Sequence, residues 1–293
     1  MDSRNQDRTM DFKQESIQTI ISAALFEDIG AEDHSSKASI PDFKTAEANL
    51  IFKENGVVAG ICLAEEILHK VDANLMVEKL VEDGQRVRPG AIGLKIFGRA
   101  HSILKAERLL LNFLQRLSGI ATATRHLTEK IAHTQAKILD TRKTTPNLRI
   151  LEKWAVLQGG GMNHRFGLFD MIMLKDNHID CAGGVKKAIE NTHLYLKKNQ
   201  LDLKIEVETR NMKEVKEALE TQKVHRIMFD NFSPQQIIDA IALVPENLET
   251  EASGGITEEN IVEYANTGVQ FISVGALTHS TKSLDMSLKI RIK

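Results

Sequence analysis

The segment LKIEVETRNMKEVKEALETQKVHRIMFD, residues 203–230, contains two short apolar runs separated by residues with a helical pattern. The runs LKIEV and RIMF have the length of buried strands, and they end at Glu208 and Asp230. A strand, a helix and a second strand in this order favour parallel strands with the helix outside them. This segment therefore predicts an α/β fold.

The same rhythm continues on both sides of this segment. Ser233 precedes Pro234, which places a capping residue before a proline at the first helical position. Thr257 is expected to cap a later helix and Gly268 to end it. Because six strand candidates are visible, we predict an incomplete, open α/β barrel of parallel strands. The runs are AKILD (136–140), DMIMLK (170–175), LKIEVE (203–208), RIMFD (226–230), LETEAS (248–253) and QFISVG (270–275).

The first part of the chain has a different texture. Residues 12–29 have apolar side chains at helical spacing, and residues 46–103 contain short runs separated by glycines and a proline. One helix is expected to interrupt these strands near residues 63–71. A long helical pattern follows over residues 102–132, with a break expected near Gly119. These features indicate a separate α/β domain before the barrel.

Composition excludes several classes of protein. The chain has 293 residues, of which 42% are hydrophobic, so a large core can form. Its formal net charge of −2 gives no reason to expect nucleic acid or an acidic membrane as a partner. No apolar run approaches the ~18 residues of a membrane helix, and the charged start MDSRNQDRTMDF lacks a signal-peptide stretch. With Cys62 and Cys181 as the two cysteines, a reducing cytoplasmic location is expected.

Polar residues stand at the end of every strand candidate of the barrel. In α/β barrels the carboxyl ends of the strands form one rim, and active sites lie there. A single charged residue after a strand is as easily explained by loop solvation, but six in succession are not. The residues at these ends are Thr141, Arg142, Lys143, Lys175, Glu208, Asp230, Ser253, Gly254, Gly255 and Gly275.

Basic residues crowd one part of this rim. Arg142, Lys143, His164, Arg165 and Lys175 fall within a short stretch of the chain. Such a cluster suits a substrate with several negative charges, since arginine binds carboxylate or phosphate through two parallel hydrogen bonds. Arg149 and Lys153 are four residues apart on an expected helix. For these two, a solvated helix face is an equally good interpretation.

Acidic residues occupy the other part. Glu208 and Asp230 could hold Mg²⁺ through water, hydrogen-bond ribose hydroxyls or stabilise positive charge on a sugar ring. Glu206 points to the same side of its strand as Glu208 and could line the same cavity deeper down. The alternative for Glu206 is a buried partner of a barrel lysine or arginine.

Glycines follow the last two strands. Gly254, Gly255 and Gly275 would let backbone N–H groups approach a phosphate, although tight turns also need glycine. Residues 159–161 form a glycine triplet that precedes Asn163. This triplet lacks the phosphate-loop pattern and is expected to form a sharp turn.

The stretch LDTRKTTPNLRILEKWAVLQGGGMNHRFGLFDMIMLKDNHID, residues 139–180, resembles the core of the quinolinate phosphoribosyltransferases, also called carboxylating nicotinate-nucleotide pyrophosphorylases. The resemblance covers most of the chain and keeps the order of the motifs. The other matching stretches are LFEDIG, EDGQRVRPG, ILKAERLLLNFLQRLSGIATAT, EVETRN, IMFDNF, EASGGITEENI and FISVGALTHS.

The resemblance implies a sandwich-like N-terminal α/β domain over residues 1–115, a barrel over residues 116–277 and a C-terminal segment, 278–293, that packs on the first domain. It implies transfer of phosphoribose from phosphoribosyl pyrophosphate to quinolinate with decarboxylation, Mg²⁺ as cofactor, and a homodimer with shared active sites. Whether dimers assemble further is left open.

Site residues follow from the same motifs. Four residues would surround the two quinolinate carboxylates, and Lys143 would reach the pyrophosphate. Glu208 and Asp230 would bind the ribose, and they would hold Mg²⁺ indirectly, through water or substrate. Arg108 would come from the neighbouring subunit; its alternative is a helix-surface arginine paired with Glu107 or Asn112. The carboxylate set is Arg142, His164, Arg165 and Lys175, and the 5′-phosphate set is Ser253, Gly254, Gly255, Val274, Gly275 and Ala276.

Three departures from the family pattern are visible. Asn147 stands where glycine is expected, and asparagine tolerates a left-handed backbone. Trp154 replaces a usual tyrosine, and GAEDHSS, residues 30–36, replaces GxGDxTT. None removes an expected contact. Three rival functions remain: a related transferase for another aromatic acid, of the type linked to molybdate transport; a lyase that only decarboxylates; and a non-catalytic nucleotide sensor.

Overall fold

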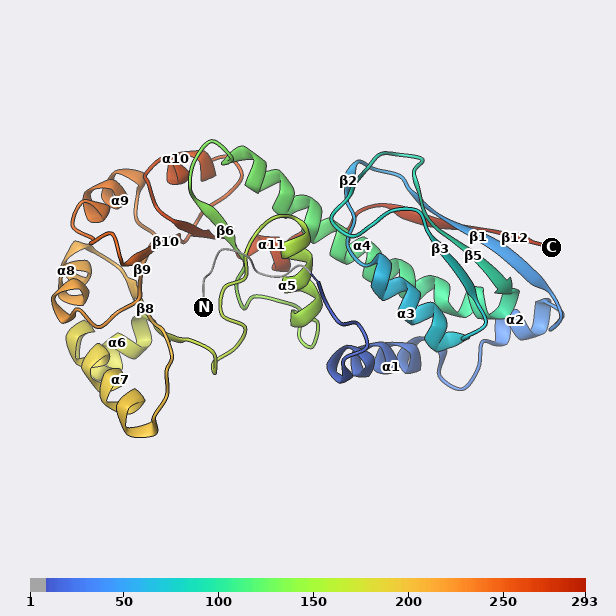
Figure 1. Cartoon of the computed structure of the whole chain (residues 1–293), viewed down its shortest axis with the longest axis horizontal. Coiled ribbons are helices and arrows are strands. Elements are labelled where there is room, and N and C mark those ends of the chain that lie inside the picture. Colours follow the sequence, from blue (N-terminus) through green and yellow to red (C-terminus); the bar gives the residue numbers. More distant parts are fainter. Residues whose placement is uncertain (1–8) are drawn as a thin grey trace. The chain divides into compact units, whose positions relative to one another are not determined.

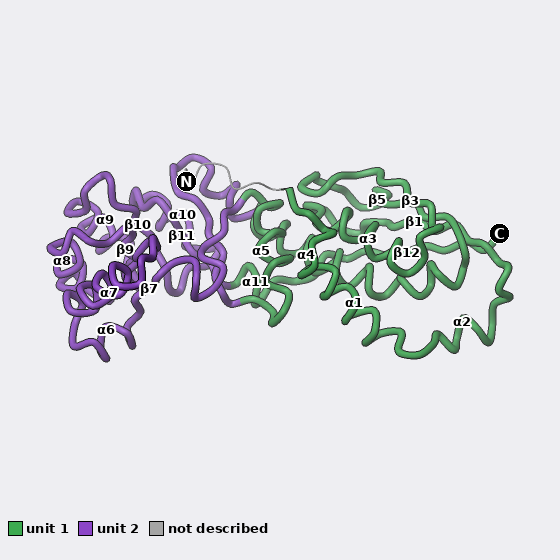
Figure 2. Tube along the Cα trace, turned by 60° about the horizontal axis from the view of Figure 1, so that its bottom comes forward, with its two compact units in different colours: residues 1–125, 144–160, 276–293 green, residues 126–143, 161–275 purple. Residues whose placement is uncertain are grey.

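The computed structural model describes residues 9–293, which form two compact units (Figure 2). The first unit contains residues up to 125 together with residues 144–160 and 276–293. The second contains residues 126–143 and 161–275. These bounds differ from the expected ones, because residues 144–160 join the first unit instead of the barrel. The charged start MDSRNQDRTMDF was predicted to contain no signal peptide. Its first eight residues, 1–8, lie outside the described residues.

The first unit is built on a four-stranded antiparallel sheet with the order β12-β1-β5-β3. Side chains alternate along β1, so that Ala46, Ala48, Leu50 and Phe52 are buried while the residues between them are half-buried. The C-terminal strand pairs with β1, which ties the end of the chain into this unit. The strands are β1 (Thr45–Phe52), β3 (Met76–Lys79), β5 (Ile92–Arg99) and β12 (Met286–Ile292), beside a small ribbon of β2 (Gly56–Val57) and β4 (Arg86–Val87).

Helices build two further layers on this sheet. Buried side chains of α3 (Ile61–Val71) and α4 (Ala100–Lys130) pack against β1 and β5 in one core. The opposite sides of α3 and α4 pack against α1 (Glu15–Ile29) and α5 (Arg149–Gln158) in a second core. Trp154 of α5 is buried there, with its ring 5.1 Å from that of Phe12, so it serves packing. The two remaining helices of this unit are α2 (His34–Ser39) and α11 (Ala276–His279).

Helix α4 is continuous through Gly119, so the predicted break is wrong. A Cβ atom at Gly119 would lie 2.3 Å from the carbonyl oxygen of Lys282. The glycine is therefore needed for the close approach of the C-terminal segment to the helix, although it costs helix stability of about 1 kcal/mol relative to alanine.

The second unit contains the six predicted strands in one parallel sheet with the order β6-β11-β10-β9-β8-β7. The sheet is not closed, because β6 and β7 are its two edges. The predicted fold class, an open α/β barrel after a sandwich-like α/β domain, is confirmed. The strands are β6 (Lys137–Leu139), β7 (Ile172–Leu174), β8 (Ile205–Thr209), β9 (Arg226–Asp230), β10 (Glu249–Ser253) and β11 (Phe271–Ser273).

The helices of this unit lie outside the strands (Figure 1). Ser233 caps α9 through a hydrogen bond from the N–H of Gln236, as predicted. Thr257 does not cap α10: residues 258–260 form a turn, Asn260 precedes the helix, and the N–H of Thr257 donates to Oδ1 of Asn260. The helices are α6 (Asp176–Ala182), α7 (Val185–Asn199), α8 (Met212–Thr221), α9 (Pro234–Ile241) and α10 (Ile261–Ala265).

Within residues 9–293, every helix is too short or too polar to span a bilayer.

Candidate active site

The carboxyl ends of the strands of the second unit, here called the barrel mouth, bring the predicted residues onto one edge of the sheet. Because neighbouring strands are parallel and in register, Asp230 on β9 lies opposite Ser253 on β10, and Leu139 on β6 lies opposite Ser273 on β11. The sites at this edge are Thr141, Arg142 and Lys143 after β6, Lys175 after β7, Glu208 on β8, Asp230 on β9, Ser253, Gly254 and Gly255 at the end of β10, and Val274 and Gly275 after β11.

Two predicted site residues belong to the first unit. Arg108 is an exposed residue of α4, and Ala276 is the first residue of α11. The barrel mouth of the second unit therefore contains all the other predicted site residues.

Arg142 and Arg165 form a pair of half-buried cations in the second unit. Burial lowers the pKa of Arg165, and the positive charge of Arg142 lowers it further. The guanidinium of Arg165 donates from Nη1 to the carbonyl oxygen of Met171 over 3.1 Å. The two guanidinium groups repel each other in a partly desolvated place. An anionic ligand would relieve that repulsion, so the pair is suited to bind one.

Lys175, Glu208 and Asp230 form an ionic group at three neighbouring strand ends. Nζ of Lys175 donates to Oε2 of Glu208 over 2.8 Å. Burial raises the pKa of Asp230, and the charge of Glu208 raises it further. Nδ2 of Asn231 donates to Asp230 over 2.8 Å. Two carboxylates that repel each other at a partly buried edge fit a cation or sugar hydroxyls.

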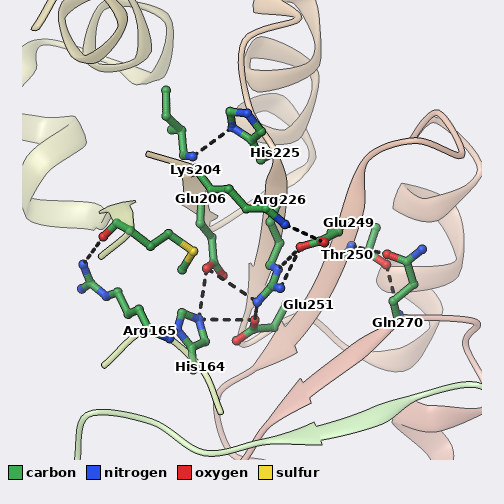
Figure 3. A network of polar contacts seen from close by, with 12 residues as sticks. His164, Arg165, Lys204, Glu206, His225, Arg226, Glu249, Thr250, Glu251 and Gln270 are labelled. Carbon is green, nitrogen blue, oxygen red and sulfur yellow. Dashed lines mark hydrogen bonds and ion pairs between the residues drawn. The ribbon is translucent and has the colours of Figure 1, made fainter. Parts of the chain in front are cut away.

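His164 is buried, and its ring points toward carboxylates in the barrel interior (Figure 3). Its Nε2 lies 3.0 Å from Glu206 and 3.4 Å from Glu251. Burial lowers the pKa of His164, but the carboxylates of Glu206 and Glu251 outweigh it and raise this pKa. The peptide N–H of Arg165 is 2.7 Å from Nδ1 and donates to it. Because only an unprotonated Nδ1 can accept this bond, the ring that makes it is neutral and carries its proton on Nε2, toward the two carboxylates.

Glu206 is a fully buried partner of charged barrel residues, the second of its two predicted alternatives. It lies opposite Arg226 in the strand register, with 3.9 Å between its Oε2 and Nη1 of Arg226. Nη1 of Arg226 also donates to Glu251 over 2.9 Å, and the guanidinium reaches Glu249 over 2.7 Å. Burial and the charge of Glu251 raise the pKa of Glu206.

Sequence reasoning missed three members of this network: Asp140, Arg226 and Glu251. Asp140 is buried and accepts the peptide N–H of His164 over 2.8 Å. Arg226 is the first residue of β9, which is otherwise mostly apolar, and Glu251 is the middle residue of β10, ETEAS. The available signal was an arginine and a glutamate on two expected strands of one buried sheet, because an unpaired charge there would be costly.

The glycines after β10 adopt a left-handed backbone, which fits both a phosphate loop and a tight turn. Gly254 has φ 89°, and a Cβ atom there would lie 2.3 Å from Oδ1 of Asn231. Gly255 has φ 61°. At the next strand, the N–H of Val274 donates to the carbonyl oxygen of Leu139 over 3.0 Å. This amide extends the pairing of β11 with β6, so backbone contacts to a phosphate there depend on Gly275 and Ala276.

Three residues of the first unit bear on the sequence analysis. Lys153 on α5 is 1% exposed, so the interpretation as a solvated helix face is wrong for it; α5 packs within the first unit. Asn147 has φ 66°, the left-handed backbone predicted for it. Burial raises the pKa of Cys62 to about 11, which leaves it a poor nucleophile.

An open barrel of parallel strands with paired arginines, paired carboxylates and a glycine loop at one edge defines an α/β enzyme that handles phosphorylated, polyanionic substrates. Models of two protein domains match the chain. The quinolinate phosphoribosyl transferase N-terminal domain matches residues 33–118, and the C-terminal domain matches residues 120–289. The chain belongs to the quinolinate phosphoribosyltransferase family.

Individual relatives agree with this assignment. "Quinolinate phosphoribosyltransferase [decarboxylating] 1b" of Nicotiana tabacum is 49% identical over 286 residues, which cover 92% of this chain and 81% of the relative. "Probable nicotinate-nucleotide pyrophosphorylase [carboxylating]" of Bacillus subtilis is 40% identical and is covered to 94%, as is this chain. Other plant relatives are named as chloroplastic or mitochondrial enzymes.

A solved structure, NadC from Streptococcus pyogenes, superposes with a TM-score of 0.92 at 40% identity, covering 97% of this chain and 100% of that chain. The predicted family and its enzyme class, a decarboxylating phosphoribosyltransferase of pyridine nucleotide synthesis, are confirmed.

Proposed function

We propose that the barrel mouth of the second unit joins the ring nitrogen of quinolinate to C1 of the ribose of phosphoribosyl pyrophosphate. In this reaction the N–C1 bond forms, the bond from C1 to pyrophosphate breaks, the adjacent carboxylate leaves as CO₂, and a proton takes its place. The products are nicotinate mononucleotide, pyrophosphate and CO₂. The observation that carries the proposal is the pair of half-buried arginines, Arg142 and Arg165, in which the charge of Arg142 lowers the pKa of Arg165.

Quinolinate offers two neighbouring carboxylates. Arg142, Arg165 and Lys175 supply three cations from the loops after β6 and β7, and His164 stands directly before Arg165. Guanidinium groups bind carboxylates with fixed geometry, so they orient the ring as well as hold it. A neutral base such as nicotinamide offers these cations no carboxylate.

Phosphoribosyl pyrophosphate brings a leaving group and a sugar that becomes positively charged. Lys143 is exposed at the barrel mouth and can neutralise the departing pyrophosphate. Glu208 and Asp230 can accept ribose hydroxyls and stabilise the developing charge on C1. Ser253, Gly254 and Gly255, with Gly275 and Ala276, offer backbone amides to the 5′-phosphate.

Magnesium fits the same carboxylates. The raised pKa of Asp230, caused by burial and by Glu208, marks a place where added positive charge is favourable. Glu208 and Asp230 would hold Mg²⁺ through water, and the ion would neutralise charge on the pyrophosphate.

The dimer is part of the proposal. Arg108 is exposed on α4 of the first unit, where it could complete the quinolinate site of a neighbouring chain. The loop after Arg165 exposes apolar side chains, Leu168 at 74% and Phe169 at 71%, which a second chain would cover. We also propose a cytoplasmic location, which cell fractionation with an antibody would test.

Incubation of the purified chain with quinolinate, phosphoribosyl pyrophosphate and Mg²⁺, followed by chromatography, tests the reaction. We expect nicotinate mononucleotide only when both substrates are present. CO₂ release without phosphoribosyl pyrophosphate would indicate the decarboxylating lyase. Binding of phosphoribosyl pyrophosphate without product would indicate the sensor. Turnover of another aromatic acid in preference to quinolinate would indicate the related transferase linked to molybdate transport.

A further inference from the structure

His164 is held at three points inside the second unit (Figure 3). Its peptide N–H donates to the buried carboxylate of Asp140 over 2.8 Å. Its Nε2 faces Glu206 at 3.0 Å and Glu251 at 3.4 Å. Its Nδ1 accepts the peptide N–H of Arg165 over 2.7 Å. Both ring nitrogens therefore already face groups of the same chain. Of the two neighbours His164 and Arg165, Arg165 is the one that can reach a ligand.

Arg165 is fixed from two sides. Its peptide N–H is bound to the ring of His164, and its guanidinium donates from Nη1 to the carbonyl oxygen of Met171 over 3.1 Å. A rotation of the imidazole would release the first of these bonds and shift the Arg165 backbone. The direction of the guanidinium thus depends on what holds the ring.

We propose that Glu251, with Glu206, is a positioning residue for quinolinate binding: the two carboxylates fix the imidazole of His164, and the imidazole fixes Arg165. The inference rests on the proposed placement of Arg165 at a quinolinate carboxylate. Glu251 is assigned no contact with quinolinate and acts through His164.

Charge balance in the barrel interior supports this role. The buried carboxylates Glu206 and Glu251 come from β8 and β10, and Arg226 enters from β9 between them. Burial would raise the pKa of Glu251, but His164 and Arg226 lower it, and the hydroxyl of Ser273 on β11 adds to this effect. The group needs the imidazole because Arg226 alone cannot balance both carboxylates, and a buried unbalanced charge is costly.

The same geometry bears on metal binding. His164, Glu206 and Glu251 offer three ligand atoms within 4.8 Å of one another. Nη1 of Arg226 lies 2.9 Å from Oε2 of Glu251, however, which is the oxygen that faces His164, so a cation already contacts this carboxylate oxygen. The guanidinium of Arg226 would repel a metal ion at this place. The imidazole is therefore the better partner of the two carboxylates.

Two substitutions on β10 separate positioning from general loss of structure. Glu251 and Glu249 both bind Arg226, but of the two only Glu251 contacts His164. We expect Glu251→Gln to raise the KM for quinolinate about tenfold or more, as the loss of a charge-assisted bond would. The KM for phosphoribosyl pyrophosphate should stay within about twofold. Glu249→Gln should change neither.

A second readout follows the ring itself. In protein labelled with ¹⁵N-histidine, one ring should be neutral with its proton on Nε2 in the wild type and in Glu249→Gln, because Nδ1 accepts the peptide N–H of Arg165. In Glu251→Gln the preference for this tautomer should weaken, because a carboxylate that faces Nε2 is gone. Glu206→Gln, which leaves Glu251 and Arg226 paired, should act in the same way if Glu251→Gln does not fold.

The outcomes distinguish this inference from the site assignment. If Arg165→Ala raises the KM for quinolinate while Glu251→Gln and Glu206→Gln leave it unchanged, the positioning role is overturned and the site assignment stands. If Arg165→Ala itself leaves quinolinate binding intact, the site assignment fails and takes the positioning role with it. A stoichiometric metal in the purified protein that Glu251→Gln removes would also overturn the inference, in favour of a metal centre.

Discussion

Nζ of Lys175 lies 2.8 Å from Oε2 of Glu208, so a cation assigned to quinolinate is bound to a carboxylate assigned to ribose. The ammonium is 46% exposed at its side chain, while the side chain of Glu208 is 10% exposed. The pair therefore joins the two halves of the proposed site, and substrates would compete with it for both partners.

The pair gives a prediction for Glu208→Gln. Loss of the carboxylate removes a group that stabilises charge on the sugar, so kcat should fall by about 10²–10³. Binding of quinolinate should not weaken, because Lys175 no longer has a competing partner. Steady-state kinetics and calorimetry with quinolinate measure the two effects.

Glu214→Gln is the matched control, since Glu214 is also nearly buried and bound to a basic residue, Arg210, but lies on α8 instead of at the carboxyl end of a strand. It should leave kcat within a few-fold. If Glu208→Gln instead weakens quinolinate binding tenfold at unchanged kcat, the carboxylate serves only to orient Lys175.

The second prediction concerns Arg165→Ala. Because we place Arg165 on a quinolinate carboxylate, its loss should weaken quinolinate binding by roughly 1.5–3 kcal/mol and phosphoribosyl pyrophosphate binding by less. Calorimetry with each substrate measures this. Arg210→Ala, which removes an arginine paired with Asp180 and Glu214, is the control and should alter neither affinity. Equal losses for both substrates in Arg165→Ala would argue against the assignment.

The third prediction concerns metal. Activity should vanish in EDTA and return with Mg²⁺, and Asp230→Asn should raise the Mg²⁺ concentration needed for half-maximal rate. Asp180→Asn removes an exposed aspartate of α6 and should leave that concentration unchanged. Full activity in EDTA would remove the ion from the reaction and leave Glu208 and Asp230 as ribose ligands.

Much of the barrel could be predicted because its signals are local. Most strands of the barrel are short apolar runs, and the polar residues assigned to the barrel mouth stand at or after their carboxyl ends, as at Glu208 and Asp230. The placement of α5 in the first unit could not be predicted, since it depends on packing against helices distant in sequence. The roles of Arg226 and Glu251 depend on strand register, which sequence periodicity alone does not fix. Gly119 was misjudged because its partner, the Lys282 carbonyl, is far along the chain.

The last prediction concerns the proposed dimer. Arg108 is exposed on α4 of the first unit and Lys143 is exposed at the barrel mouth of the second unit. If Arg108 completes the neighbouring chain's site, Arg108→Ala and Lys143→Ala should each be nearly inactive. In a mixed dimer one site carries both changes and the other carries neither, as the two-fold symmetry of such an interface requires.

Unfolding and refolding the two variants together should therefore restore activity, towards about a quarter of the wild-type value if chains pair at random and sites act independently. Two different affinity tags, one on each variant, show by sequential purification that mixed dimers have formed. Arg108→Ala alone, unfolded and refolded in the same way, controls for recovery on refolding. Tagged mixed dimers that stay as inactive as their parents would show that Arg108 does not act across the interface, because the intact site would then be present without activity.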